Sequence, residues 1–368
     1  MNNKNIQTYF DFGNSKIRAG VFVGVDQFYN EGKFSLNHLS LNEQIHNIIT
    51  SLEKESNEYI NNINLMIDSQ KMLSIGISIS KKTDGSILKQ EDVQFLIQEA
   101  KQQISKNYKK LNIVHIIINN YKINGIDYTI IPNEPKCFLI SLDIIFICFP
   151  NETILNFKNI FFNSNILINQ IICSSYAKSV NYKKNLNLTG NTSFIDIGFS
   201  KTSMISFHND KLVSLDTLPI GGNHITKDIS KILTVDLEES EAIKLDTIKN
   251  QEIQNNAHYS NEKIQKIILA RIEEILELSI KSITSNSFKS SSSSFRVFLT
   301  GNGSKILNNS YKEKIAISKD LIILEDTTDN ICKSGLQLGM GLNKQEVVIV
   351  AKKRIKQGFF EKLFHFFN

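Results

Sequence analysis

The sequence predicts an α/β protein with two core-bearing domains, and three stretches carry this prediction. Residues 192–222 read as a strand, a tight turn, a second strand, a hairpin turn and a third strand. Residues 9–22 repeat the strand–turn–strand pattern, and residues 295–307 run from a buried strand into Gly301 and Gly303. At 368 residues, the chain is long enough for two hydrophobic cores.

Each of the first two stretches has an Asp at the end of a strand and a glycine turn directly after it. Asp11 precedes Gly13, and Asp196 precedes Gly198. Such a turn exposes backbone N–H groups to phosphate oxygens, and the carboxylate can reach Mg²⁺ directly or through water. A single Asp-x-Gly is usually only a turn, so the weight of the pattern lies in its second copy.

Two such hairpins, followed by a strand and Gly-x-Gly, resemble the nucleotide cleft of the actin-like ATPases. The run LPIGGNHITKDIS at 218–230 and the run LTGNGS at 299–304 are similar to segments of one branch, the FtsA family of bacterial cell-division proteins. The resemblance covers nearly the whole chain. It implies an actin-like (ribonuclease H-like) two-domain ATPase fold with an FtsA-type insertion, subdomain 1C, and a C-terminal amphipathic helix.

The same resemblance implies a division of the chain. Subdomain 1A is expected at 1–79, 162–191 and 327–343, 1C at 80–161, 2A at 192–229 and 297–326, and 2B at 230–296. The β–α–β–β–β–α pattern of residues 81–160 favours 1C over a generic insertion. Hydrophobic periodicity predicts helices at 41–59, 90–104 and 262–283. Helices are also expected at 152–162, 224–232 and 237–248, and the resemblance implies a connecting helix at 330–341. A helix is also expected after Gly303, and a strand at 315–323.

The resemblance implies ATP and Mg²⁺ as ligands, with Asp11 and Asp196 at the metal. An alternative is that Lys16 and Arg18 are solvated strand residues. Likewise, Glu241 and Lys244 could form a surface i,i+3 pair. The implied nucleotide-binding residues are Asp11, Gly13, Asn14, Ser15, Lys16 and Arg18 in the first loop; Asp196, Gly198, Phe199, Ser200, Lys201, Thr202, Gly221 and Gly222 around the second; and Glu241, Lys244, Gly301, Asn302, Gly303 and Lys305 near adenosine.

Several positions depart from the family pattern. Phe199 and Ser200 stand where the second loop commonly has glycines, which lets backbone approach phosphate and permits positive φ. ATP binding is therefore expected with weak or absent hydrolysis, and Lys201 is a candidate point charge for phosphate. Lys178 replaces a small residue in the first connecting helix and is expected to loosen the interdomain hinge.

Residues 344–358 read as a basic linker, and residues 359–368 as a short amphipathic helix. A large apolar face beside basic residues suits the interface of an anionic membrane, whereas the alternative is docking on the protein's own core. The apolar face consists of Phe359, Phe360, Leu363, Phe364, Phe366 and Phe367.

Composition and charge narrow the classes of binding partner that are expected. The net charge of +5 is modest and spread out, so nucleic acid is not expected. The four cysteines have no metal-ligand spacing, and no leader peptide or bilayer-spanning run is recognised, which predicts a cytoplasmic protein.

The FtsA resemblance implies an ATP-binding division protein that polymerises and anchors the FtsZ ring to the cytoplasmic face of the bacterial inner membrane, at the division site. Its expected partners are the FtsZ C-terminal peptide, further copies of itself, anionic lipid and other division proteins. A PilM-like pilus-assembly protein and a small-molecule kinase of the same superfamily are the alternatives. The candidate FtsZ contacts are Lys263, Lys266, Arg271 and Lys281.

Overall fold

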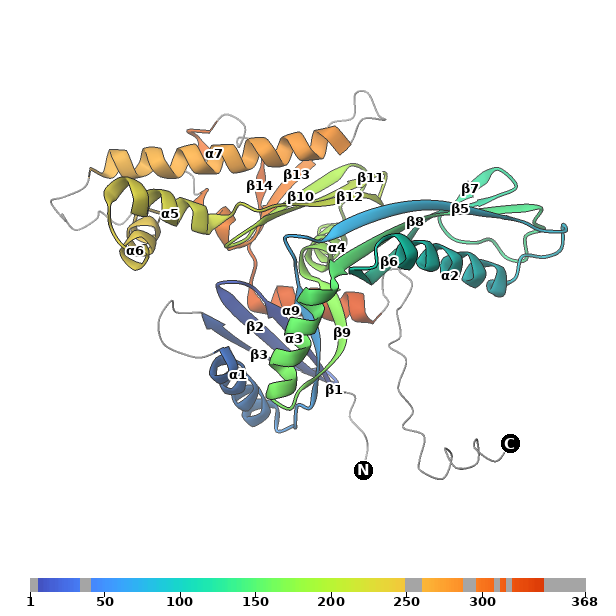
Figure 1. Cartoon of the computed structure of the whole chain (residues 1–368), viewed down its shortest axis with the longest axis horizontal. Coiled ribbons are helices and arrows are strands. Elements are labelled where there is room, and N and C mark those ends of the chain that lie inside the picture. Colours follow the sequence, from blue (N-terminus) through green and yellow to red (C-terminus); the bar gives the residue numbers. More distant parts are fainter. Residues whose placement is uncertain are drawn as a thin grey trace.

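Two five-stranded sheets and one four-stranded sheet organise the chain (Figure 1). The computed structural model describes residues 6–33, 41–248, 260–286, 296–307, 312–315 and 320–340. The predicted tail helix at 359–368, its basic linker and the membrane-facing residues named above lie outside these ranges. No helix within the described ranges is long and apolar enough to cross a bilayer.

The first sheet has the strand order β3-β2-β1-β4-β9. β1 pairs with β2 as an antiparallel hairpin and with β4 in parallel. Helix α1, Leu41–Ser56, covers the hairpin side with an apolar stripe that includes Ile45 and Leu52. The strands are β1 Ile6–Phe12, β2 Lys16–Val23, β3 Asp26–Lys33, β4 Asn62–Ile67 and β9 Leu167–Cys173.

The second sheet repeats this plan in the order β12-β11-β10-β13-β14. β10 pairs antiparallel with β11 and parallel with β13, as β1 does with its own neighbours. Both central strands therefore end in an Asp-x-Gly turn at corresponding places, as the sequence predicts. The strands are β10 Thr192–Ile197, β11 Thr202–His208, β12 Lys211–Leu218, β13 Arg296–Thr300 and β14 Ile322–Ile323.

The third sheet has the order β5-β8-β6-β7 and packs against α2, Gln90–Asn107. Asn124 and Gly125 both have positive φ, which forms the hairpin turn between β6 and β7. α3, Asn151–Asn163, returns the chain to the first sheet. The strands are β5 Leu73–Lys82, β6 Leu111–Ile123, β7 Ile126–Tyr128 and β8 Leu139–Pro150.

Two predicted domain boundaries differ from the structure. The third sheet begins with β5 at Leu73, not at residue 80, because β5 pairs along its whole length with β8. The boundary at 229/230 falls inside α5, Gly222–Leu233. α5, α7 and the second sheet share one core, so 2A and 2B are not separate hydrophobic units. The helices beyond α5 are α6 Leu237–Ile248 and α7 Asn261–Asn286.

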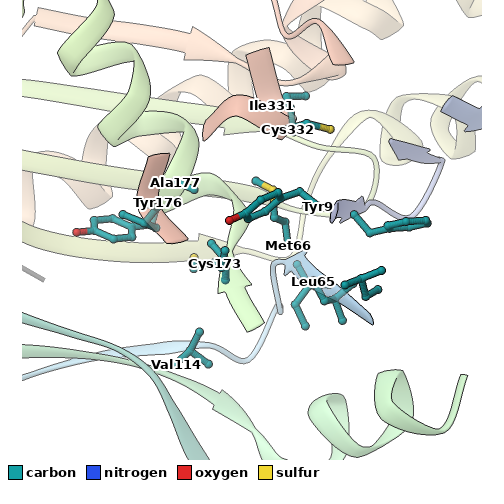
Figure 2. Packing of buried hydrophobic residues seen from close by; sticks show 14 of the residues in the cluster. Tyr9, Leu65, Met66, Val114, Cys173, Tyr176, Ala177, Ile331 and Cys332 are labelled. Carbon is teal, nitrogen blue, oxygen red and sulfur yellow. The ribbon is translucent and has the colours of Figure 1, made fainter. Parts of the chain in front are cut away.

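Helices α4, Ser174–Asn185, and α9, Thr328–Gly339, pack on each other between the first two sheets (Figure 1). Tyr9, Met66, Tyr176 and Cys332 belong to the core that they cover (Figure 2). A Cβ on Gly335 would lie 2.5 Å from the Met66 sulfur, so α9 approaches the sheet at a position where only glycine fits.

Two elements near the C-terminal end of the described chain are shorter than expected. After Gly301 the chain forms a 3₁₀ helix, η1 Asn302–Ile306, in place of an α-helix. β14 has only two residues, although a strand was predicted over 315–323, of which 316–319 lie outside the described residues.

Candidate functional site: a cleft between the two five-stranded sheets

Two turns of matching sequence face each other across the cleft. They are DFGNSK, residues 11–16, and DIGFSK, residues 196–201. The Gly13 N–H donates to the Lys16 carbonyl at 3.0 Å, and the Gly198 N–H donates to the Lys201 carbonyl at 2.9 Å. A Cβ on either glycine would lie within about 3 Å of that same carbonyl oxygen, which accounts for glycine at both positions.

The two turns touch. The Asn14 side-chain amide donates to the Ser200 hydroxyl, and Gln70 Nε2 donates to the Ser200 carbonyl at 3.0 Å. The cleft beneath them has a volume of about 90 Å³. It is lined by Asp11, Phe12, Gly13, Asn14, Ser15, Lys16, Arg18, Asp68, Ser174, Lys178, Asp196, Gly198, Phe199, Ser200, Lys201, Gly301, Asn302 and Asp326.

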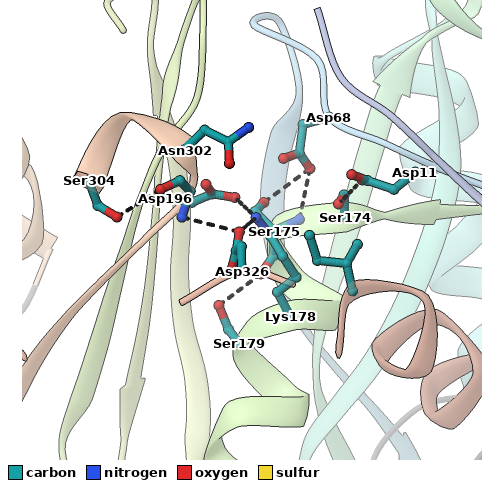
Figure 3. Close-up of polar contacts among 12 residues, drawn as sticks. Asp11, Asp68, Ser174, Ser175, Lys178, Ser179, Asp196, Asn302, Ser304 and Asp326 are labelled. Atoms are coloured by element: carbon teal, nitrogen blue, oxygen red, sulfur yellow. Dashed lines mark hydrogen bonds and ion pairs between the residues drawn. The ribbon is translucent and has the colours of Figure 1, made fainter. Parts of the chain in front are cut away.

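Lys178 lies at the base of the cleft (Figure 3). It extends from α4, and its Nζ is 2.5 Å from Asp196 Oδ2 and 2.8 Å from Asp326 Oδ2. Asp326 Oδ1 accepts from the Tyr182 hydroxyl at 2.7 Å, and Asp326 Oδ2 also accepts from the Gly301 N–H at 3.1 Å. The prediction that Lys178 loosens the hinge is wrong, because its ammonium joins α4 to the second sheet.

The Lys178 ammonium stays charged although it is buried. Burial alone lowers the pKa of a lysine, but attraction to Asp196 and Asp326 outweighs burial and raises the pKa of Lys178 well above its usual value. Burial raises the pKa of Asp196 to about 6 against the pull of Lys178. Burial also acts to raise the pKa of Asp326, but Lys178 and the Tyr182 hydroxyl together hold it below its usual value.

The first turn carries a second internal ion pair. Arg18 Nη1 lies 3.0 Å from Asp11 Oδ2, and Ser174 Oγ donates to Asp11 Oδ1 at 2.5 Å. Arg18 Nη2 donates to Asn302 Oδ1 at 3.1 Å. Arg18 is thus buried and ion-paired, not a solvated strand residue, and Lys16 at the cleft rim pairs with Glu31.

Asp11 and Asp196 do not fit a directly bound Mg²⁺ in this arrangement. Both oxygens of Asp11 already accept from side-chain donors, and Asp196 Oδ2 is held by Lys178. Mg²⁺ needs several oxygen ligands at about 2.0–2.1 Å, and here it would lie against an ammonium. Among the described residues no group of three or more His, Cys, Asp or Glu side chains is placed to hold a metal ion. The metal prediction therefore gains no support from the geometry.

Comparison with known proteins tests the predicted family resemblance. Residues 193–343 match the family model of the cell division protein FtsA. The FtsA of Bacillus subtilis is 25% identical, covering 76% of this chain and 69% of that protein, and the FtsA of Agrobacterium fabrum is 20% identical, covering 70% and 62%. The predicted resemblance to the FtsA family is confirmed.

A solved structure supports the fold. The PilM–PilN type IV pilus biogenesis complex superposes with a TM-score of 0.60 at 13% identity, over 91% of this chain and 96% of that chain. The predicted actin-like fold is therefore confirmed for this FtsA-related chain.

The remaining nucleotide residues expected from FtsA lie behind the second turn and do not line the cleft described above. The Gly222 N–H donates to the Gly198 carbonyl at 3.0 Å, so the first turn of α5 supports the loop. Thr202 Oγ1 donates to the Ile220 carbonyl at 2.7 Å. A Cβ on Gly221 would lie 2.5 Å from the Gly198 carbonyl oxygen, which makes its role packing of the loop.

The pair predicted for the adenosine pocket of FtsA is buried against α5. Lys244 Nζ lies 2.6 Å from Glu241 Oε2, 2.8 Å from Thr226 Oγ1 and 3.2 Å from the Gly222 carbonyl. Burial lowers the pKa of Lys244 although Glu241 opposes it. The Lys244 ammonium is therefore not part of an exposed surface pair, and in this structure it is not free to contact adenosine. Gly303 packs on Ile197, and Lys305 lies 3.5 Å from Glu325.

Five residues of the cleft lining were not predicted as site residues from the FtsA resemblance, namely Phe12, Asp68, Ser174, Lys178 and Asp326. Asp68 follows β4 and Ser174 follows β9, and both strands run parallel to β1, so their carboxyl ends meet beside Asp11. That topological rule is a signal that could have found them. Asp326 precedes α9, and no local pattern marks it as the partner of Lys178.

The candidate FtsZ contacts lie on α7 and differ in their surroundings. Arg271 forms a two-pronged ion pair with Asp228 of α5, at 2.6 and 3.0 Å, and a further pair with Glu274. Lys266 pairs with Glu262 one turn away. Lys263 and Lys281 are exposed, and their separation of eighteen residues places them on one side of the helix.

Proposed function

We propose that the chain is an ATP-binding cell-division protein of the FtsA type. The paired turns carry this proposal, because two Asp-x-Gly hairpins face each other with Lys16, Arg18 and Lys201 around one cleft. Their backbone amides and basic side chains suit the oxygens of a polyphosphate. The family match to residues 193–343 supports the division role.

Binding of ATP requires the cleft to widen. Sites for drug-sized ligands have volumes of about 300–1,000 Å³, whereas this cleft has about 90 Å³. The contact between Asn14 and Ser200 bridges its mouth. We infer that nucleotide separates the two turns while α4 and α9 remain packed. Mg²⁺ has no part in this proposal, because the carboxylates predicted to bind it hold internal cations.

Calorimetry of ATP binding tests the proposal. Lys201→Met removes a basic side chain from the cleft lining and should weaken binding about tenfold, which corresponds to roughly 1.4 kcal/mol. Lys82→Met, an exposed change in β5, is the matched control and should leave binding unchanged. Absence of ATP binding by the unaltered chain would overturn the proposal.

The finer parts of the function follow the FtsA resemblance. We infer that the chain assembles with copies of itself and with other division proteins, that it binds the FtsZ C-terminal peptide through α7, and that residues 359–368 attach it to the cytoplasmic face of the inner membrane. Sedimentation with anionic and neutral liposomes tests the last point. Removal of residues 359–368 should abolish co-sedimentation with anionic vesicles and leave ATP binding intact, and equal sedimentation of the shortened chain would refute it.

A pilus-assembly role is the second candidate, since the fold is close to that of the PilM–PilN complex. The two roles predict different ligands. Binding of an FtsZ C-terminal peptide with no binding of a PilN-type peptide favours division, and the reverse result favours pilus assembly.

A further inference from the structure

A lysine occupies the place in the cleft where two carboxylates from different parts of the chain converge. Lys178 is only 7% exposed, and its ammonium lies between Asp196 at the end of β10 and Asp326 before α9 (Figure 3). A lysine ammonium is a compact point charge with three donors. Through its contacts with Asp196 and Asp326, the Lys178 ammonium acts as a cation that bridges the two carboxylates.

The carboxylate oxygens of Asp326 and Asp11 are also engaged. Asp326 accepts from Tyr182 and from the Gly301 N–H, and Asp11 accepts from Arg18 and Ser174. A divalent ion entering here would have to displace the ammonium and would be repelled by it. Removing the ammonium would leave two buried carboxylates facing each other, which is the arrangement that a divalent ion favours.

The charges of the cleft lining balance only when Lys178 is counted. Four carboxylates, Asp11, Asp68, Asp196 and Asp326, face four basic side chains, Lys16, Arg18, Lys178 and Lys201. Without Lys178 the lining would carry a net negative charge toward an incoming polyphosphate. With Lys178 the site is neutral before any metal binds.

We propose that Lys178 is a tethered substitute for the divalent cation, so that this chain binds a nucleoside triphosphate without Mg²⁺. The inference rests on the proposed ATP-binding function and specifies how the cleft neutralises phosphate charge. It follows from the buried bridge between Asp196 and Asp326 and from the balance of the lining charges.

The first test compares ATP binding by the unaltered chain in excess EDTA and in excess Mg²⁺. The dissociation constant should differ by less than about threefold between the two conditions. Mg²⁺ tightening binding by about tenfold or more overturns the inference while leaving the proposed function intact. Absence of binding in both conditions overturns the proposed function, and the inference with it.

The second test uses Lys178→Met, which keeps an unbranched side chain and removes the charge. In EDTA this variant should bind ATP about tenfold or more weakly than the unaltered chain, and Mg²⁺ should restore most of the loss. Lys183→Met, on the same helix but paired with Asp210, should behave as the unaltered chain. Equal loss in EDTA and Mg²⁺ for Lys178→Met contradicts the inference.

A third measurement needs no nucleotide, and its first part uses only the unaltered chain. Electron paramagnetic resonance of added Mn²⁺ should detect no stoichiometric site in the unaltered chain. Where Lys178→Met folds, it should gain one such site that Asp326→Asn in the same background removes. Stoichiometric Mn²⁺ binding by the unaltered chain that Asp196→Asn abolishes would refute the substitution of metal by lysine.

Discussion

Gly301 connects β13 to the cleft through a backbone conformation that disfavours every other residue. Its φ is +85°, and a Cβ would lie 2.3 Å from Asp196 Oδ1 and 2.4 Å from the Ile197 carbonyl oxygen. Gly301→Ala should therefore lower the free energy of unfolding by about 2 kcal/mol or more, measured by chemical denaturation.

Gly76 in β5 provides the control for that change. No heavy atom lies within 4 Å of a Cβ at this position, so Gly76→Ala should change the free energy of unfolding by no more than about 0.5 kcal/mol. A Gly301→Ala loss as small as the Gly76→Ala change would mean that the cleft backbone adapts easily.

The thiols give a second prediction at this scale. All four cysteines are buried, and burial raises the pKa of Cys148 to about 12 and those of Cys173 and Cys332 well above the usual value. Near pH 8 the native chain should react with iodoacetamide at least about a hundredfold more slowly than the urea-unfolded chain. Comparable rates would mean that the core opens readily.

The same pKa shifts of the thiols make the stability of the folded chain depend on pH. A thiol whose pKa is higher in the folded than in the unfolded chain contributes stability that is complete below the unfolded pKa and is lost as the pH rises toward the folded pKa. The free energy of unfolding should fall between about pH 8.5 and pH 10.5, and the fall should be smaller in Cys148→Ala. An equal fall in both chains would assign the effect to other groups.

Single residues also show how far sequence reasoning reaches. Asp11, Gly13, Asp196 and Gly198 are recognisable because each pair is encoded locally by a strand and a turn. The pairing of Lys178 with Asp326 is not recognisable from the sequence, because 148 residues separate the two. Phe199 replaces a glycine of the family pattern, and backbone strain was expected there because glycine permits positive φ. No residue of the 198–201 turn has positive φ, so this strain is not present.

At the scale of elements, α7 has a structural surface and, as we propose, a recognition surface. Arg271 fixes it to α5 through Asp228, and a buried stripe that includes Ile268 and Ile275 fixes it to the second sheet. The exposed Lys263 and Lys281 lie on one side of the helix, about 27 Å apart at 1.5 Å per residue. A bound acidic peptide would have to run along the helix axis to meet both.

The double change Lys263→Glu with Lys281→Glu should therefore weaken binding of an FtsZ C-terminal peptide about tenfold and leave the melting temperature unchanged. Fluorescence anisotropy of a labelled peptide measures the affinity, and its salt dependence should decrease. Arg271→Glu is the comparison, because it opposes Asp228 and should lower the melting temperature. Unchanged affinity in the double variant would place the peptide elsewhere.

Hydrophobic periodicity predicted most elements, and its errors have physical causes. α2 and α7 begin and end within a few residues of prediction because each carries a long apolar stripe. α6 also has its predicted bounds, although its buried residues are the polar Ser240, Lys244 and Thr247. β5 was assigned to the wrong sheet, since a half-buried strand gives no local sign of its pairing partner. The segment after Gly301 is too short to show helical periodicity and forms a 3₁₀ helix instead.

At the scale of the whole molecule, two sheets of the same plan lie on either side of α4 and α9. The Lys178 bridge joins α4 to the second sheet at the base of the cleft, and the Asn14–Ser200 contact joins the two turns at its mouth. Opening at the mouth while the base stays joined is a hinge motion, in which α4 and α9 provide the fixed part. The sequence predicts two facing turns, but not that they touch.

A cross-link at the mouth tests whether nucleotide binding needs this motion. In the variant Asn14→Cys with Ser200→Cys, a short thiol-to-thiol cross-linker that is cleaved by a mild reductant should join the two turns, since their side chains are in contact. The native cysteines are buried and should not compete. Calorimetry should show ATP affinity reduced about tenfold or more after cross-linking and restored after cleavage.

Each single-cysteine variant, treated in the same way, should keep its affinity, because it cannot tie the turns together. A cross-linked chain with unchanged affinity would mean that ATP does not enter between the turns, and the site would then have to be sought outside this cleft. Loss of affinity in the single variants as well would assign the effect to the side chains themselves. Reversible loss confined to the double variant is the result that separation of the two sheets requires.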